Sequence, residues 1–190
     1  MRSSGSRIIV ALAIGTAVLA SAAYAAITTF RQDGFSEYIG LQGGPAQVTA
    51  RTLTTPVGET TGLWHYHPGH VYNVVTQGTI TIEDGCGQIN QYSVGDAFET
   101  SEGRVHRAYN LGSVDAKESN MFVGPPHRPI GVNIPNNEHR CGPPSTVAEC
   151  KNYRWTTFNH PAAFANQGAC VAYVHHRERV TLLVPEDPIP

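Results

Sequence analysis

Charged side chains are scarce in this chain, where they make up 15% of 190 residues. Lysine is almost absent, with only Lys117 and Lys151 against eleven arginines, and the formal net charge is −2. A protein that binds nucleic acid through electrostatic attraction needs a broad basic face, which this composition does not supply. We therefore expect no nucleic-acid partner.

The chain also lacks an uninterrupted apolar run of the ~20 residues that a helix needs to cross a bilayer. Its longest apolar stretch, residues 8–20, follows Arg2 and Arg7 and precedes the small-x-small sequence Ala23-Tyr24-Ala25. These are the three parts of a secretory signal peptide. We expect residues 1–25 to be cleaved after Ala25, so that the protein is secreted without stable membrane insertion. An uncleaved N-terminal anchor is the alternative.

Cysteine is scarce as well, and the C-x-x-C spacing that is common in structural zinc sites is missing. The four cysteines are an even number in a chain that we expect to be exported, which favours two disulfide bonds over a metal site. Of the three pairings that four cysteines allow, we favour Cys150 with Cys170, which closes a short loop. Cys86 with Cys141 would then tie the C-terminal region to the preceding domain.

What the sequence has instead is a series of short β-branched and aromatic runs separated by Gly, Pro, Asn and Asp. Short strands at regular spacing, without a sustained helical period, are typical of a closed antiparallel β-barrel or jelly roll. We therefore predict an all-β domain over residues 26–134. From residue 47 onward its predicted strands are Gln47–Thr55, Thr60–His67, His70–Gln77, Thr79–Glu83, Ile89–Ser93, Ala97–Thr100, Val105–Asn110, Ala116–Val123 and Ile130–Ile134.

The rest of the chain begins with a stretch rich in Pro, Asn and Gly. We predict a linker over residues 135–149, followed by a small appendix and tail over residues 150–190. The appendix is expected to contain one short helix around Pro161–Ala165 and a last strand, held together by the Cys150–Cys170 bond.

Two histidine-bearing segments lie about forty residues apart. His65 and His67 are two positions apart, so on a strand their imidazoles face the same side. His106 follows a Gly-containing turn and can reach the same space from a neighbouring strand. Imidazole is the commonest metal-binding side chain, and three on one interior face form a facial metal site.

The segment from Gly58 to Asn110 resembles the cupin family in the order and spacing of two histidine motifs. The resemblance implies a jelly-roll barrel with a metal near one mouth. It also implies that His65, His67 and His106 hold one divalent transition metal, which could be Fe, Mn, Ni, Cu or Zn. The positions that carry the resemblance are His65, His67, Gly78, Gly95, Gly103, His106 and Asn110.

One departure from the family pattern bears on chemistry, because Val71 stands where the family usually has a glutamate ligand. Three neutral imidazoles leave the +2 charge of a divalent cation uncompensated, so the site favours an anionic exogenous ligand. It also leaves coordination positions open for a substrate and dioxygen. His70 is a candidate fourth ligand, although strand alternation points it away from Val71 and the interior.

Alternation along the predicted strands also yields a candidate pocket. Val71, Asn73 and Val75 share the inward face of one strand, and we expect Leu63 and Phe98 to add apolar surface. A mostly apolar lining with few polar groups suits a small organic ligand.

Two functional classes stay open. Some three-histidine cupins are iron dioxygenases, so the resemblance implies a metal-dependent oxidoreductase that acts on a small organic substrate. The alternative is a non-catalytic cupin module that binds a small ligand or a metal, which the missing carboxylate favours. The sequence assigns no catalytic acid or base. Many cupins dimerise through their sheets, which makes a homodimer a further expectation.

Overall fold

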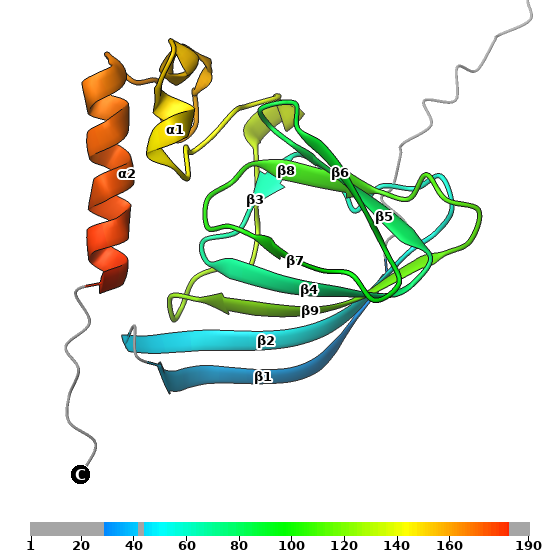
Figure 1. Ribbon diagram of the computed structural model, residues 1–190. Helices are drawn as coiled ribbons and strands as arrows, with labels where there is room; N and C mark the ends of the chain where they lie inside the picture. Colours follow the sequence, from blue (N-terminus) through cyan, green and yellow to red (C-terminus); the bar gives the residue numbers. More distant parts are fainter. Residues whose placement is uncertain (1–28, 42–43, 183–190) are drawn as a thin grey trace, which may run out of the picture.

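The computed structural model of the protein describes residues 29–41 and 44–182, so the predicted signal peptide lies outside the described residues. Two five-stranded antiparallel sheets face each other (Figure 1). This is the antiparallel jelly roll that the strand pattern predicts. In spatial order, the first sheet contains β1 (Thr29–Leu41), β2 (Gly44–Thr55), β9 (Ala116–Gly124), β4 (His70–Gln77) and β7 (Ala97–Thr100). The second contains β10 (Val132–Asn133), β3 (His65–Tyr66), β8 (His106–Tyr109), β5 (Thr79–Asp84) and β6 (Ile89–Ser93).

The observed strands follow the predicted ones closely, with β3 as the main difference. The sequence predicts a strand over Thr60–His67, but β3 covers only His65–Tyr66. Gly62 has a φ of 128°, which interrupts an extended backbone, and the Thr60 hydroxyl donates a hydrogen bond to the carbonyl oxygen of Ala108. The segment before β3 is therefore irregular although its composition favours a strand.

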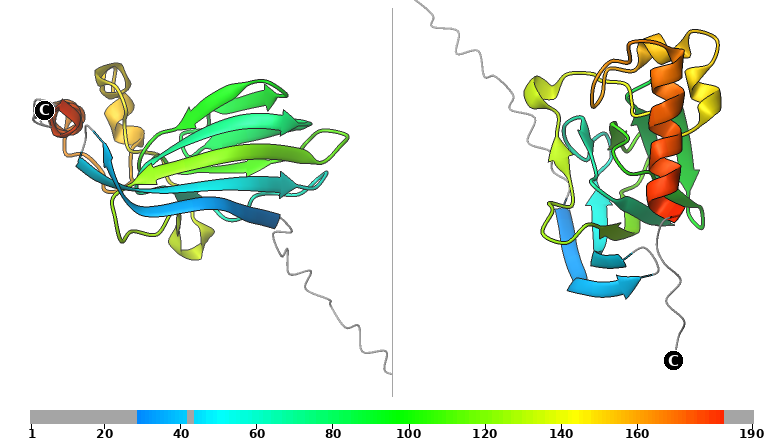
Figure 2. Two further views of the ribbon diagram at one scale, coloured as in Figure 1. Left: turned by 90° about the horizontal axis from the view of Figure 1, so that it is seen from below. Right: turned by 90° about the vertical axis from the view of Figure 1, so that its left-hand side faces the viewer.

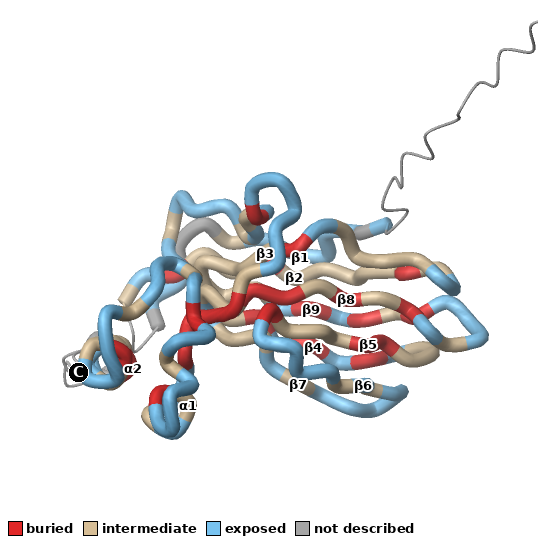
Figure 3. The backbone as a smooth tube through the Cα atoms, turned by 90° about the horizontal axis from the view of Figure 1, so that it is seen from above, coloured by how far each residue is buried: buried red, intermediate tan, exposed pale blue. Residues whose placement is uncertain are grey.

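The space between the sheets is filled by apolar side chains at one part of the barrel. Val75 on β4 and Ile80 on β5 are fully buried there, together with Ala108 and Ala116. Burial of a valine or isoleucine side chain stabilises a fold by roughly 1.5–3 kcal/mol. Figure 3 shows that buried positions run along the middle of the strands, whereas many of the connecting loops are exposed.

The C-terminal appendix is helical, and here the sequence-based prediction is wrong. Its long helix, α2, covers Gln167–Leu182 and begins after the predicted Pro161–Ala165 segment; no strand follows β10 in the described part of the chain. The side chain of Asn166 accepts a hydrogen bond from the backbone N–H of Ala169, as a helix N-cap does. The shorter helices are the 3₁₀ turns η1 (Pro135–Asn137) and η2 (Arg154–Thr157) and the α-helical turn α1 (Val147–Cys150).

Two disulfide bonds hold the appendix, with the pairing that we favour from the sequence. Cys150 is bonded to Cys170 inside a small core that also contains Phe158, and Cys86 is bonded to Cys141. The second bond joins the loop after β5 to the segment that leaves η1. The appendix consequently lies against one end of the barrel, with α2 on its outside (Figure 2). Among the described residues, no helix is long and apolar enough to span a membrane.

Candidate metal centre

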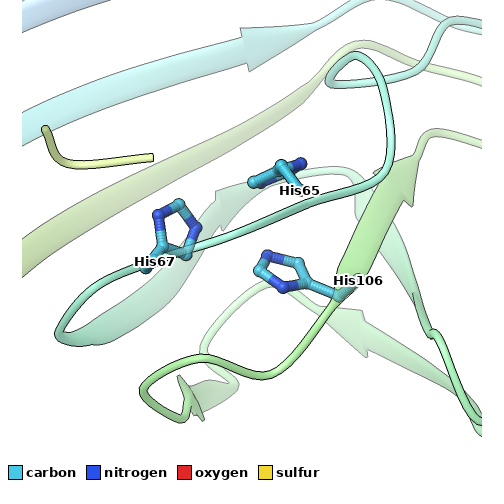
Figure 4. Close-up of side chains that lie close together, drawn as sticks. All are labelled: His65, His67 and His106. Atoms are coloured by element: carbon cyan, nitrogen blue, oxygen red, sulfur yellow. The ribbon is translucent and has the colours of Figure 1, made fainter. Parts of the chain in front are cut away.

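Three histidines meet between the two sheets (Figure 4). His65 on β3 lies directly opposite His106 on β8, and His67 follows the end of β3. The ring centroids are 4.5–5.0 Å apart, and one nitrogen of each ring lies within 4.8 Å of the others. Among the described residues, no other group of three or more His, Cys, Asp or Glu side chains is arranged closely enough to hold a metal ion.

Each of the three imidazoles is oriented by a backbone carbonyl. A carbonyl oxygen can only accept a hydrogen bond, so Nδ1 carries the proton in each ring and Nε2 keeps its lone pair. This is the tautomer that a metal bound at Nε2 requires, and such a hydrogen bond also fixes the plane of the ring. The Nδ1–O distances are 2.8 Å for His65 to Leu63, 2.5 Å for His67 to Ile130, and 2.8 Å for His106 to Arg104.

Burial keeps these rings neutral. Loss of hydration lowers the pKa of His65, and it lowers the pKa of His106 well below its usual value. The pKa of His67 falls to about 4, first through desolvation, then through unfavourable electrostatic coupling with His65, which would oppose a second proton at the triad, and through the charge of Arg51. Neutral imidazoles bind a metal without first releasing a proton, so the donor set fits a transition-metal ion.

A cavity of about 350 Å³ opens beside the triad. Its walls come from both sheets and are mostly apolar, with a few polar groups at fixed places, as in a small-molecule site. Besides the histidines, its lining includes Arg51, Leu53, Val71, Asn73, Ile82, Phe98, Glu118, Asn120, Phe122 and Ile130.

Three of the predicted pocket residues line this cavity and two do not. Val71, Asn73 and Phe98 belong to the lining. Leu63 is 46% exposed, because the chain bends at Gly62 before β3 begins. Val75 faces inward but lies further along β4, where it packs into the apolar core rather than against the cavity.

His70, the candidate fourth ligand, lies outside the triad. Its Nδ1 is 2.6 Å from a carboxylate oxygen of Glu99, and both side chains are more than 40% exposed. Strand alternation explains this position, because Val71 points inward and its neighbours His70 and Tyr72 point outward.

Glu118 and Asn120 on β9 were not singled out by the sequence analysis. Glu118 is 4% exposed, and burial raises the pKa of its carboxyl group to about 7, an effect that a hydrogen bond with Asn120 partly opposes. The Asn120 amide donates to the side-chain oxygen of Asn73 at 2.5 Å. The signal was present in the sequence, since alternation from the buried Ala116 places Glu118, Asn120 and Phe122 on the inward face.

Comparison with known proteins identifies the part of the chain that contains these residues. Residues 51–119 match the family model of the cupin domain. The chain contains a cupin domain. This domain includes all three histidines and Glu118. A search of curated proteins finds no match.

Several solved structures resemble the cupin domain at low identity. One is an RmlC-like cupin with a double-stranded β-helix fold from Methanocaldococcus jannaschii, at 18% identity over 54% of this chain and 84% of that chain, with a TM-score of 0.42. A cupin domain from Bordetella pertussis matches at 19% identity over 52% and 94% of the two chains, with a TM-score of 0.42. Oxalate oxidase in complex with the substrate analogue glycolate matches at 19% identity over 46% of each chain, with a TM-score of 0.39.

Proposed function

We propose that the protein is an exported, metal-dependent cupin enzyme of the oxidoreductase class, dioxygenase-like in its chemistry, that acts on a small organic anion. The observation that carries this proposal is the common orientation of His65, His67 and His106, whose Nδ1 atoms are all held by backbone carbonyls. Three imidazole nitrogens suit one divalent ion of Fe, Mn, Ni, Cu or Zn.

The charge of the cavity favours an anionic substrate. The three ligands are neutral, so they leave the charge of a divalent ion uncompensated, and Arg51 adds a positive charge to the lining. Val71 occupies the position at which the family usually has a ligand carboxylate, and it is 2% exposed. Glu118 is the one carboxylate among the lining residues that the structure describes, and its raised pKa leaves it only partly ionised at neutral pH.

In the proposed mechanism, a bound metal ion and the residues of the cavity wall have different roles. When bound, a transition metal supplies Lewis acidity and, in the case of Fe, Mn or Cu, electron exchange. Glu118 can hold or release a proton near pH 7 at its carboxyl oxygen, which makes it the candidate acid–base group. Asn120 and Asn73, linked to each other, present fixed polar atoms beside it. Ile82 and Phe98 add apolar surface to the lining.

Export is supported by the two disulfide bonds, since such bonds persist mainly in oxidising compartments. It is further supported by the signal-peptide pattern of residues 1–25, which lies outside the described residues.

A metal titration tests the binding part of this proposal. The purified metal-free protein should take up one equivalent of Co²⁺, and His106→Ala should abolish this uptake. His176→Ala is the matched control, because His176 is an exposed histidine on α2, far along the chain from the triad. Uptake by His106→Ala with unchanged affinity would refute the assigned centre.

A turnover assay distinguishes the proposed enzyme from the alternative, a non-catalytic cupin module. The alternative is favoured by Val71, which stands where the family usually has a ligand carboxylate. Protein loaded in turn with Fe, Mn, Ni, Cu or Zn is supplied with small carboxylates and enolates, and oxygen uptake is recorded. We expect consumption that Glu118→Gln reduces at least tenfold, as the loss of an acid–base group does. Saturable ligand binding without turnover, with each of the five metals, would decide for the module.

A further inference from the structure

The loop that carries His106 is held by the segment that follows the barrel as well as by the barrel. The contacts begin at Cys141, so the predicted linker packs with the helices after it, and residues 141–182 together are called the appendix from here on. Arg104, two residues before His106, has a side chain that is 14% exposed. Its guanidinium bonds Asp84 at the end of β5, with Nη2 2.5 Å and Nε 3.0 Å from the same carboxylate oxygen. Its Nη1 donates to the carbonyl oxygen of Pro143 at 2.9 Å and lies 3.2 Å from a carboxylate oxygen of Glu149 in α1. Two of these three partners belong to the segment that follows the barrel.

The backbone of the same loop is fixed on both sides. The N–H of Val105 donates to Gly142 at 3.0 Å, and its carbonyl oxygen accepts from Gly85 at 2.7 Å. Cys86 and Cys141, the immediate neighbours of those two glycines, are joined by a disulfide bond. The peptide before His106 is therefore enclosed by two segments that are covalently tied to each other.

The contacts of Arg104 and Val105 bear on the candidate metal centre through His106. The carbonyl oxygen of Arg104 accepts the hydrogen bond from Nδ1 of His106, so the position of this peptide sets the orientation of the ring. The N–H of Gly103, next to Arg104, donates to the carbonyl oxygen of His67 at 2.8 Å. The appendix also reaches β3, where the ring of His160 lies 4.8 Å from that of Tyr66, between the two other ligands.

We propose that the appendix is a clamp on the metal centre and that Arg104 is its positioning residue. Arg104 does not line the cavity, so its effect passes through the carbonyl that orients His106. An ion pair removed from water contributes little net stability, because desolvation offsets the attraction. The cluster around Arg104 is better explained by the geometry that it imposes on the neighbouring ligand. This inference rests on the proposed function where it predicts a change in metal affinity. Its second prediction, a change in the tautomer of His106 in the metal-free protein, does not depend on the proposed function.

The test compares Arg104→Gln with a matched control, Arg107→Gln. Arg107 lies on β8 beside His106 and also forms an ion pair, at 2.8 Å with Glu83, but neither residue belongs to the appendix. Long-range ¹H–¹⁵N spectra of the metal-free proteins report the tautomer of His106. We expect a single Nδ1–H tautomer in the wild type and in Arg107→Gln, and a mixture of tautomers in Arg104→Gln. Co²⁺ affinity should fall about 10- to 100-fold in Arg104→Gln alone, the usual effect of losing the support of a ligand.

The outcomes of this test decide whether Arg104 positions His106. A single Nδ1–H tautomer in Arg104→Gln, with Co²⁺ affinity and absorption bands like those of the wild type, would overturn the inference. If the wild type takes up no metal, the proposed function fails, and the tautomer alone decides the role of Arg104. If Arg104→Gln does not fold, Glu149→Gln replaces it, because this change removes the charge that Arg104 pairs with in α1. A glutamine oxygen can still accept from the backbone N–H groups of Ser145 and Thr146, as the carboxylate of Glu149 does. The same two readouts should then change in the same direction, and an unchanged tautomer in Glu149→Gln would overturn the clamp.

Discussion

At the scale of single residues, burial acts on Glu118 and on the histidines in opposite directions. Loss of hydration disfavours the charged form of any group, so the pKa of the carboxyl rises while those of the imidazoles fall. The walls of the cavity therefore carry little charge of their own near neutral pH, apart from Arg51. This is the condition under which an anionic ligand and a cation at the triad would stabilise each other most strongly.

Glu118→Gln should stabilise the protein at high pH. The pKa of this carboxyl rises from 4.5 to about 7 on folding, so the native state binds more protons than the unfolded state between these values, and stability falls as pH rises through them. The stability advantage of the variant should grow by roughly 3 kcal/mol between pH 4.5 and pH 8. Urea unfolding of both metal-free proteins across this range measures it. An advantage that does not change with pH would show that Glu118 ionises normally.

Val71→Glu should tighten metal binding at the triad. Position 71 is buried and lines the cavity, so a carboxylate there can offset part of the cation charge. The metal-free variant should be less stable than the wild type because it buries an acid, and its melting temperature should rise more when Mn²⁺ or Fe²⁺ is added. Val74→Glu, on the opposite face of β4 and 43% exposed, is the control. Equal metal-induced shifts in both variants would place position 71 outside the site.

The three histidines of the candidate centre could be predicted at this scale, but Glu118 could not be singled out. His65 and His67 share a face because of their spacing, and His106 falls opposite His65 in the strand register. Glu118 lies in a strand that the sequence predicts, yet an acidic residue in a β-strand is ordinarily solvated. Alternation places Glu118 on the same face as Ala116, but the tertiary structure is needed to show that this face lines the cavity.

At the scale of elements, strands could be predicted where one face is buried, and the helix α2 could not. Alternation is clear along β4, where buried and exposed positions take turns. The sequence of α2 includes Val171, Tyr173 and Val174, residues with low helix propensity, and lacks a clear apolar stripe. Tertiary contacts decide its structure instead. Cys170 and Val174 are one turn apart and both lie in the disulfide-linked core of the appendix.

The two disulfide bonds should contribute unequally to stability. In the chain-entropy treatment, the Cys86–Cys141 bond, with a sequence separation of 55, stabilises the fold by about 4 kcal/mol, and the Cys150–Cys170 bond, with a separation of 20, by about 3 kcal/mol. Replacing each pair by alanine and measuring denaturant unfolding tests this order. The larger loss should come from Cys86→Ala with Cys141→Ala. A larger loss from the other pair would mean that packing in the appendix outweighs loop closure.

At the scale of the whole molecule, the metal-free protein should lose stability on acidification. The pKa of His67 falls from 6.5 to about 4 on folding, so between these values the unfolded state binds the additional proton. His67 alone then removes roughly 3 kcal/mol as the pH falls from 7 to 4. His65 and His106 act in the same direction, whereas Glu118 acts in the opposite direction over pH 7 to 4.5.

Chemical unfolding of the metal-free protein at pH 7, 5.5 and 4.5 measures this balance. Three histidines outweigh one carboxyl, so the free energy of unfolding should decrease toward pH 4.5. His67→Gln should flatten the curve. A free energy of unfolding that is constant or rises on acidification would contradict the burial of the triad in its neutral form.

The central claim is that three oriented imidazoles hold a metal ion. Elemental analysis tests it most directly, on protein that is exported by its own N-terminal segment and purified without chelators. We predict close to one equivalent of Fe, Mn, Ni, Cu or Zn per chain. A protein that contains no metal, and that takes up none of these ions when they are added, would contradict the account.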